Sequence, residues 1–520
     1  MAPQQAGLAL VLVALAAAAA AEVIQDATTT ATVHLGDVSP FNHVWKECVG
    51  SGHALLGTRA DWRAHLQNVT RDLGFKRVRF HGILDDDMTS VYDGKPSFYN
   101  VFQVYDFMLR NGVRPVVELS FMPRSFFSCN PSVNCTYAFG NPVGGYKVRM
   151  EDLNPLCRHH IITYSMHTLL LACLLACLLV CLLAYTVEMW GIAYPFPYLN
   201  LYNATATALK SVHPSLKVGG PATMQVQHVA DFIHNTSARG IPVDFVSTHL
   251  YPSDPNCNLP STRNDPDCFA HTLQSTQKIA AAAHLPLLIT EYNDGLEGTP
   301  PHRDTAYAAA FVFHNVPLVQ NLSLFSWWTF TDVFEEGGMN PSPFSNAFGL
   351  QNIYGVAKPV YRAFQLLNDA GRFALRTTVT QPSSQPPTGQ VRVFATINST
   401  ASAPVHEKLQ SLRVHVSNFL RLDMGECGNN TATITIPTTS PPPASLSARV
   451  YALDDWSVNP RAEWTRLGSP VYPTQQQLNR IFAASEVTPS AQELKITKEA
   501  VSFTTHLRGC SAYLVTFHVQ

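Results

Sequence analysis

Short apolar runs alternate with longer amphipathic stretches over the first two thirds of the chain. Six of these runs are rich in β-branched and aromatic residues, and they lie at residues 77–82, 115–120, 217–223, 244–251, 286–293 and 324–330. Stretches with helical spacing of apolar positions lie before and between them, at residues 55–73, 101–111, 199–212, 271–284 and 304–316. Strands that alternate with helices indicate a parallel sheet, and the length of this region predicts an eight-stranded α/β barrel, the (β/α)8 or TIM barrel.

The pattern changes after about residue 372, where apolar and polar positions begin to alternate with a period of two. The alternating segments are residues 391–397, 412–419, 431–436, 448–453 and 512–519. Such alternation, interrupted by Pro/Ser/Thr-rich linkers, is typical of antiparallel strands with one buried face. We therefore expect a barrel over residues 22–372 and an appended C-terminal antiparallel β-sandwich over residues 373–520. Residues 30–35 alternate in the same way and are expected to add a strand to the sandwich.

Side chains capable of chemistry lie at the ends of the predicted barrel strands. They are His81, Glu118, His249, Tyr251, Glu291 and Asp332. Because a barrel brings the carboxyl ends of its strands together at one mouth, we expect these side chains to surround one site. Glu291 ends an apolar strand, so its carboxylate is expected to be held on a rigid element. A structural ion pair with an arginine is the competing interpretation of a glutamate in this position.

The composition narrows the classes of function. The chain has 520 residues, and its 35 Lys and Arg residues are balanced by 37 Asp and Glu residues, which gives a net charge of −2. This balance argues against a nucleic-acid partner, because no basic face stands out to pair with phosphates. The 20 His and 11 Cys residues show no metal-ligand spacing, so we expect no metal site.

The beginning of the chain predicts where in the cell the protein is sent. Residues 8–21 form an apolar run that ends in small residues and is too short to span a bilayer, which is typical of a signal peptide over residues 1–21. Seven N-glycosylation sequons fit a secretory route, at Asn68, Asn134, Asn203, Asn235, Asn321, Asn398 and Asn429. The cysteines expected to pair in an oxidising compartment are Cys129–Cys135, Cys257–Cys268 and Cys427–Cys510. We expect a glycoprotein that is secreted or lies in the lumen of the endomembrane system, lysosome or vacuole.

Several segments, taken in order, carry a family resemblance. They include FNHVWKECVGSGHA at residues 41–54, VRFHGILDDDM at 78–88, PVVELSFMPRSF at 115–126, VDFVSTHLYP at 243–252, LLITEYNDG at 287–295 and SWWTFTDVFEEGG at 326–338. Together these blocks cover about residues 38–140 and 188–520 and resemble glycoside hydrolase family 39, the family of β-xylosidases and α-L-iduronidase. The resemblance implies a retaining hydrolase built on a (β/α)8 barrel with a β-sandwich, and it implies no metal or organic cofactor.

The resemblance also implies roles for individual residues. Glu291 matches the nucleophile after the seventh strand, and Glu188 matches the acid/base after the fourth strand. The residues that match sugar-contacting positions are His81, His249, Tyr251, Asp332 and Glu335. Two carboxyl groups suit glycoside hydrolysis, because one attacks the anomeric carbon while the other protonates the leaving oxygen. We expect a glycoside or oligosaccharide substrate, with a β-xyloside as the first choice and an α-L-iduronide as the alternative.

One segment, residues 141–187, departs from the family. Val187 stands where the family has an asparagine that binds the 2-OH of the sugar, and residues 170–185 repeat the pattern LLAC, LLAC, LLVC, LLAY. Three interpretations are open. The segment contains a transmembrane helix over residues 168–184, or it contains a buried helix of a variant protein. In the third, it is a retained intron or gene-model error that has replaced the fourth strand and its preceding helix.

The third interpretation has a consequence for activity. Loss of the fourth strand would leave its neighbours without ladder partners and would remove the base that aims Glu188, so this literal chain would be a weak or inactive enzyme. The rival function is therefore a catalytically impaired carbohydrate-binding or membrane-tethered protein. Membrane association is expected only if residues 168–184 form a genuine helix.

Overall fold

The computed structural model describes residues 28–121, 123, 196–336, 338–382 and 389–519, together with five three-residue strands between residues 127 and 181. Some predictions lie wholly or partly outside the described residues. They are the signal peptide over residues 1–21, the Cys129–Cys135 pair, the sequon at Asn134, the helix over residues 168–184, the departure at Val187 and the acid/base Glu188.

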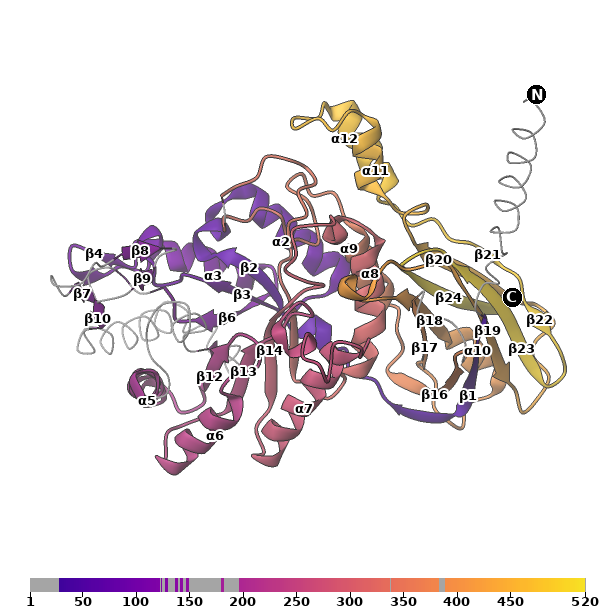
Figure 1. The fold of residues 1–520 in the computed structure, drawn as a ribbon, viewed down its shortest axis with the longest axis horizontal. Coiled ribbons are helices and arrows are strands. Elements are labelled where there is room, and N and C mark those ends of the chain that lie inside the picture. Colours follow the sequence, from indigo (N-terminus) through magenta and orange to yellow (C-terminus); the bar gives the residue numbers. More distant parts are fainter. Residues whose placement is uncertain are drawn as a thin grey trace, which may run out of the picture.

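Eight parallel strands close into a barrel in the part of the chain that the structure describes (Figure 1). In chain order they are β2 (Val49–His53), β3 (Arg77–His81), β6 (Arg114–Glu118), β11 (Leu179–Cys181), β12 (Lys217–Thr223), β13 (Phe245–His249), β14 (Leu287–Tyr292) and β15 (Leu324–Trp327). The helices that accompany them are α2 (Ala60–Leu73), α3 (Tyr99–Arg110), α5 (Phe196–Val212), α6 (Val229–Ala238), α7 (Cys268–Ala282), α8 (Ala306–Asn315) and α9 (Pro359–Leu367). The predicted α/β barrel is confirmed.

Short elements decorate the barrel. The small strands are β4 (Val91–Tyr92), β5 (Lys95–Pro96), β7 (Phe127–Cys129), β8 (Thr136–Ala138), β9 (Asn141–Val143) and β10 (Tyr146–Val148). The 3-10 turns include η1 (Val44–Glu47), η2 (Ala54–Thr58), η3 (Asp86–Met88), η6 (Pro255–Cys257), η7 (His302–Asp304) and η8 (Val316–Leu318). Of these, η3 follows β3 at the barrel mouth and contributes to the site described below.

The first barrel strand, β2, was not predicted, because its sequence VGSGH lacks the β-branched alternation of the other strands. The glycines are required by close packing. A Cβ atom on Gly50 would lie 2.4 Å from the ring of Trp328, and one on Gly52 would lie 2.3 Å from Oε2 of Glu335. Glycine at these positions therefore lets the segment that follows β15 lie directly against β2.

The fourth strand corrects the sequence-based expectation. The slot between β6 and β12 is filled by β11, which pairs in parallel with both neighbours and comes from the Leu/Cys repeat. The prediction that the repeat leaves this strand missing is therefore wrong. Residues 179–181 of the predicted helix over residues 168–184 form a strand instead. An apolar run with no periodicity fits a buried parallel strand as well as a buried helix. Among the described residues, no helix is both long and apolar enough to cross a membrane.

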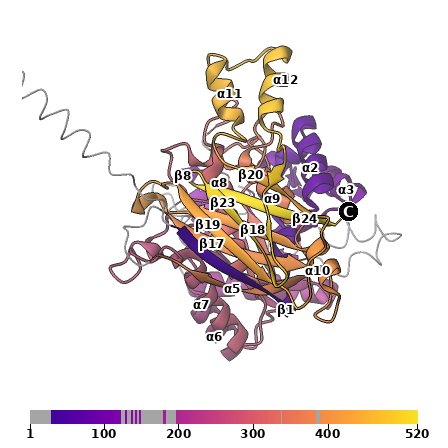
Figure 2. The same cartoon turned by 90° about the vertical axis from the view of Figure 1, so that its right-hand side faces the viewer.

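The C-terminal region forms one continuous sheet of ten strands, which faces the viewer in Figure 2. Besides β1 (Thr28–Pro40), its strands are β16 (Phe373–Thr380), β17 (Gln390–Ile397), β18 (Arg413–Phe419), β19 (Asn430–Pro437), β20 (Leu446–Leu453), β21 (Ser490–Gln492), β22 (Lys495–Ile496), β23 (Ala500–Leu507) and β24 (Ser511–Val519). β1 joins the two halves, because it pairs antiparallel with β16 and in parallel with β19. The added strand predicted at residues 30–35 is confirmed, whereas two separate hydrogen-bonded sheets are not.

Helix α8 fixes the sheet to the barrel. All ten of its residues are buried, because it lies between the barrel and strands β18 and β24 (Figure 1). This explains why its sequence AYAAAFVFHN is apolar on nearly every side. A charged cluster reinforces the contact: Asp267 accepts from Arg392 of β17 at 2.8 Å and lies 2.7 Å from Nε2 of His314 on α8.

Further helices and two disulfides complete the C-terminal region. The helices are α10 (Val405–Ser411), α11 (Pro460–Arg466) and α12 (Gln475–Ala484), and a 3-10 turn, η9, spans Leu422–Met424. The hairpin of α11 and α12 projects from the sheet (Figures 1 and 2). The predicted pairs Cys257–Cys268 and Cys427–Cys510 are formed, with Cα atoms 5.6 Å and 5.1 Å apart.

Candidate active site

A buried carboxylate, that of Glu291, lies near the carboxyl end of β14. Glu291 is only 2% exposed. The guanidinium of Arg79 from β3 donates to its Oε1, and the hydroxyl of Tyr251, just beyond β13, donates to its Oε2 at 2.9 Å. Nδ1 of His249, the last residue of β13, lies 3.3 Å from the same Oε2. Partners on rigid strands therefore hold this carboxylate in one orientation.

A second buried carboxylate, Glu118 at the end of β6, shares partners with Glu291. Arg79 bridges the two, because its guanidinium contacts an oxygen of each. His81 also lies between them, with Nδ1 3.1 Å from Oε2 of Glu118 and Nε2 3.6 Å from Oε1 of Glu291. The hydroxyl of Ser120 donates to Glu118 at 2.6 Å. The ion pair with arginine that competed with a catalytic role for Glu291 is thus present, and it lies within the site itself.

The surrounding charges keep both carboxylates ionised. Burial acts to raise the pKa of Glu291, but His249, Arg79 and His81 outweigh it, and the pKa is lowered overall. In Glu118, burial is outweighed by Arg79 and His81, and the pKa falls to about 2. A buried, oriented and ionised carboxylate is the form that attacks an electrophilic carbon.

Aromatic rings flank these charged groups. The ring of Trp328, 2% exposed, lies 4.8 Å from the His81 ring between centroids, and the Phe121 ring lies 5.7 Å from it. The guanidinium carbon of Arg79 lies 5.5 Å from the centroid of the Trp328 ring. Apolar ring faces beside a few convergent polar groups are typical of a small-molecule site, and they suit the C–H faces of a sugar.

The segment after β15 brings two more glutamates to the mouth. Oε1 of Glu336 lies 3.5 Å from Nε2 of His81, the nitrogen that also faces Glu291, so the carboxylates of Glu336 and Glu291 are no more than about 7 Å apart. Burial raises the pKa of Glu336 to about 7, and the negative charges of Glu291 and Glu335 add to this. Oε1 of Glu335 accepts from the backbone N–H of His53 at 2.8 Å. Glu336 therefore holds a proton to a higher pH than Glu291 or Glu118 does.

The structure places Asp332, another predicted sugar contact, in a different buried network. Its Oδ2 lies 2.8 Å from Nζ of Lys358, which also lies 2.7 Å from Oδ1 of Asp304. The backbone N–H of Gly349 donates to Oδ1 of Asp332 at 2.7 Å. These contacts fix the long connection between β15 and α9, and the role of Asp332 in sugar binding stays a prediction.

Glu188 lies outside the described residues, but the strand before it is placed. In β11, Cys181 pairs in parallel register with Glu118 of β6 and with Gly219 of β12. The carboxyl end of β11 therefore opens on the same mouth as Glu118 and Glu291. The acid/base role of Glu188 stays a prediction.

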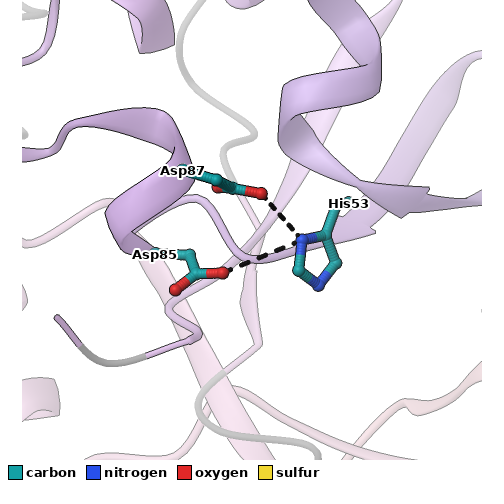
Figure 3. Close-up of side chains that lie close together, drawn as sticks. All are labelled: His53, Asp85 and Asp87. Carbon is teal, nitrogen blue, oxygen red and sulfur yellow. Dashed lines mark hydrogen bonds and ion pairs between the residues drawn. The ribbon is translucent and has the colours of Figure 1, made fainter. Parts of the chain in front are cut away.

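A further cluster at the mouth consists of His53, Asp85 and Asp87, and it is the group that could hold a metal among the described residues (Figure 3). Each offers one ligand atom, and these atoms lie within 4.8 Å of one another. Burial acts to lower the pKa of His53, but Asp87, Glu335 and Asp85 raise it to about 9. The 2.9 Å distance between Nδ1 of His53 and Oδ2 of Asp87 is that of a charge-assisted hydrogen bond, in which this nitrogen carries a proton and is not free to bind a metal.

Sequence reasoning missed several residues of this site. Arg79 stands two positions before His81 in the same strand, so the period of two places both on the same face, and this signal was available. Glu118 was recognised as a strand end but received no role. Trp328, Glu336 and His53 carried no signal in the pattern, since their positions depend on how the segment after β15 folds back on β2.

The chain is similar to known proteins over most of its length. A family model described as "Glycosyl hydrolases family 39" matches residues 33–170 and 189–498. A β-xylosidase of Caldicellulosiruptor saccharolyticus is 30% identical over 477 residues, which is 88% of this chain and 91% of that protein. The α-L-iduronidase of Homo sapiens is 23% identical over 331 residues, 56% of this chain and 48% of that protein. The crystal structure of a GH39 enzyme from Xanthomonas axonopodis pv. citri matches with a TM-score of 0.75 at 21% identity, covering 96% of this chain and 99% of that one.

The limits of the family match refine the predicted departure. The first matched part continues to residue 170, so the departure is shorter than the predicted residues 141–187. The second part begins at residue 189, immediately after Glu188.

Proposed function

The chain belongs to glycosyl hydrolase family 39, and on this premise we propose that it is a β-xylosidase-like exo-glycosidase that acts with retention of configuration. One observation supports this most strongly. The ionised carboxylate of Glu291 is buried at the end of a barrel strand and oriented by Arg79, Tyr251 and His249. No step of the reaction needs a metal or an organic cofactor.

The proposed mechanism uses two carboxyl groups in turn. Glu291 attacks the anomeric carbon, and Glu188 donates its proton to the departing glycosidic oxygen as the carbon–oxygen bond breaks. Glu188, now ionised, removes a proton from water, and the resulting hydroxide oxygen displaces Glu291 from the sugar. The first step neutralises the negative charge of Glu291, because the carboxylate becomes an ester. Arg79 and Tyr251 therefore stabilise the ionised carboxylate before the first step and again when the second step releases it.

The substrate we propose is a β-xyloside. Full-length similarity to a β-xylosidase supports it, whereas the similarity to an α-L-iduronidase covers about half of each chain. An iduronide also requires a cation for its carboxylate, and among the described residues that contact Glu291, the cation Arg79 is already paired with two carboxylates.

Two aryl glycosides test the choice of substrate. We expect hydrolysis of 4-nitrophenyl β-xyloside. Hydrolysis of 4-methylumbelliferyl α-L-iduronide should be at least about 100-fold slower, because its carboxylate would lack a cationic partner in the site. The release of nitrophenol or methylumbelliferone measures both. Faster hydrolysis of the iduronide would favour the iduronidase-like alternative. If the chain binds xylosides but turns over neither substrate, it is a catalytically impaired carbohydrate-binding protein.

The acid/base role of Glu188 has its own signature. Replacing Glu188 with alanine is expected to slow cleavage of xylobiose on the order of 10²- to 10⁴-fold, because the sugar leaving group needs a proton. Formation of the glycosyl-enzyme from 2,4-dinitrophenyl β-xyloside should change far less, since that leaving group departs without one. Pre-steady-state release of the two leaving groups gives this comparison. An equal loss with both would show that Glu188 is not the acid.

The remaining proposals concern the architecture of the C-terminal region and the cellular location of the protein. We propose that the ten-stranded sheet folds over as the predicted β-sandwich, supported by a single hydrophobic core that draws on both of its halves. We also propose a secreted or luminal glycoprotein, supported by the apolar run at residues 8–21 and by the formed disulfides. We do not propose attachment to a membrane, because it required a helix over residues 168–184 and residues 179–181 of that range lie in strand β11.

A further inference from the structure

The carboxylates of Asp85 and Asp87 converge on Nδ1 of His53, the last residue of β2 (Figure 3). We propose that His53 is a positioning residue whose imidazolium ties the segment after β15 to the segment after β3 and so holds Glu336 against His81. The inference rests on the proposed glycosidase function, and it assigns to His53 a part in that function.

One side of His53 holds the segment after β15. Its backbone N–H donates to Oε1 of Glu335 at 2.8 Å, and Nε2 of its ring lies 3.9 Å from the same oxygen. The absence of a Cβ atom on Gly52 makes room for the other oxygen of Glu335. Glu335 is therefore fixed at the end of β2 by both the backbone and the ring of one residue.

The other side of His53 faces the segment after β3. Nδ1 lies 2.9 Å from Oδ2 of Asp87 and 3.8 Å from Oδ2 of Asp85. Asp85 is itself fixed, because its Oδ1 accepts from the backbone N–H of Asp86 at 2.8 Å at the start of η3. The side chain of His53 is 13% exposed. Three carboxylates on two loops thus share one largely buried cation, and without it they would repel one another.

The cluster is linked to the reacting groups by two short routes. Glu336 follows Glu335 directly in the chain, and its Oε1 lies 3.5 Å from Nε2 of His81, which faces Glu291. The ring of His53 also packs against Phe121, with centroids 5.1 Å apart, and Phe121 in turn stacks on His81. A displacement of about 1 Å at such a site can cost on the order of 100-fold in rate.

The charge of His53 is set by the groups around it. In the described part of the chain, the titratable groups that face it are Asp85 and Asp87 from the segment after β3, and Glu335 and Glu336 from the segment after β15. Burial opposes protonation, but Asp87, Glu335 and Asp85 together raise the pKa of His53 to about 9. The cation therefore persists from the pH at which Glu291 ionises up to about pH 9.

Two substitutions in the full-length protein separate charge from packing. His53→Gln is expected to lower kcat/KM for 4-nitrophenyl β-xyloside on the order of 10- to 100-fold, because the cation is lost. His53→Arg keeps a cation and is expected to stay within about 3-fold of the wild type. The matched control is His271→Gln on α7, which removes a surface contact of 2.7 Å with Asp265. Rates are compared below the thermal unfolding midpoint of every variant.

The outcomes separate the proposals. Equal activity of His53→Gln and wild type, or equal loss in His53→Gln and His53→Arg, would overturn the positioning role. Inactivation by EDTA that zinc or calcium reverses would overturn it in favour of a metal site. Crystal structures give a readout independent of turnover: Glu336 should leave His81 in His53→Gln and remain in His53→Arg, and an unmoved Glu336 refutes the inference. A wild type that cleaves no glycoside contradicts the proposed function alone.

Discussion

Glu291→Gln is expected to abolish hydrolysis, with kcat/KM for 4-nitrophenyl β-xyloside falling on the order of 10⁴-fold or more. An amide cannot form the glycosyl ester, and it carries no charge for Arg79 and Tyr251 to orient. The amide is nearly the same size as the carboxylate, so the barrel should still fold. Nitrophenol release measures the loss of catalysis. Circular dichroism and thermal unfolding of the same sample show whether the variant is folded.

The matched control for this prediction is Glu486→Gln. Glu486 also pairs with an arginine, Arg362, but its side chain is 63% exposed and it belongs to the C-terminal region. This variant is expected to retain wild-type activity. If Glu291→Gln kept more than a few per cent of the wild-type rate, the nucleophile would have to be a different group, and Glu118 would be the first alternative to replace.

Arg79→Met is expected to have the second largest effect, on both folding and catalysis. It leaves the buried carboxylates of Glu118 and Glu291 facing each other without their shared cation. Removal of one member of a buried ion cluster typically costs about 3–5 kcal/mol of the free energy of unfolding. Chemical denaturation measures this loss. The control Arg376→Met removes an arginine of β16 that pairs with Asp37, where both side chains are 57% exposed, and it should leave the free energy of unfolding nearly unchanged.

The same variant makes a prediction about pH. Arg79 is one of the groups that lower the pKa of Glu291 against the effect of burial, so its removal raises that pKa. Since Glu291 must be ionised to attack, the acidic limb of the kcat/KM profile should move to higher pH in Arg79→Met. A limb that stayed in place, or moved to lower pH, would show that Arg79 does not set the charge of Glu291.

Much of the barrel could be predicted because its strands carry their own signal. The run ending at Glu291 is apolar, β-branched and bounded by polar sequence, and the structure has β14 there. β2 was not predicted because its glycines have a low strand propensity. They are there because Trp328 and Glu335 pack directly against them. β11 was not predicted because its run of Leu and Cys has no polar positions, so no alternation of apolar and polar residues distinguishes a strand from a helix. These residues form a strand because β6 and β12 each need a hydrogen-bonded neighbour between them.

The site was predictable only as far as strand ends determine it. His81, His249, Tyr251 and Glu291 converge because parallel strands end at one mouth. Asp332 follows the last strand by a few residues, yet the buried Lys358, 26 positions later, draws it into another network. Contacts of this kind depend on the path of long connections, which no local periodicity encodes.

Trapping the glycosyl-enzyme tests the central claim most directly. A 2-deoxy-2-fluoro-β-xyloside with a dinitrophenyl leaving group loses that group readily, while the fluorine slows release of the sugar by destabilising the oxocarbenium-like transition state. Peptide mass spectrometry then locates the sugar. We predict time-dependent inactivation with one fluoroxylosyl group on the peptide that contains Glu291. A label on Glu118 or Glu336, or an active enzyme that forms no adduct, would contradict the assignment of Glu291 as the nucleophile.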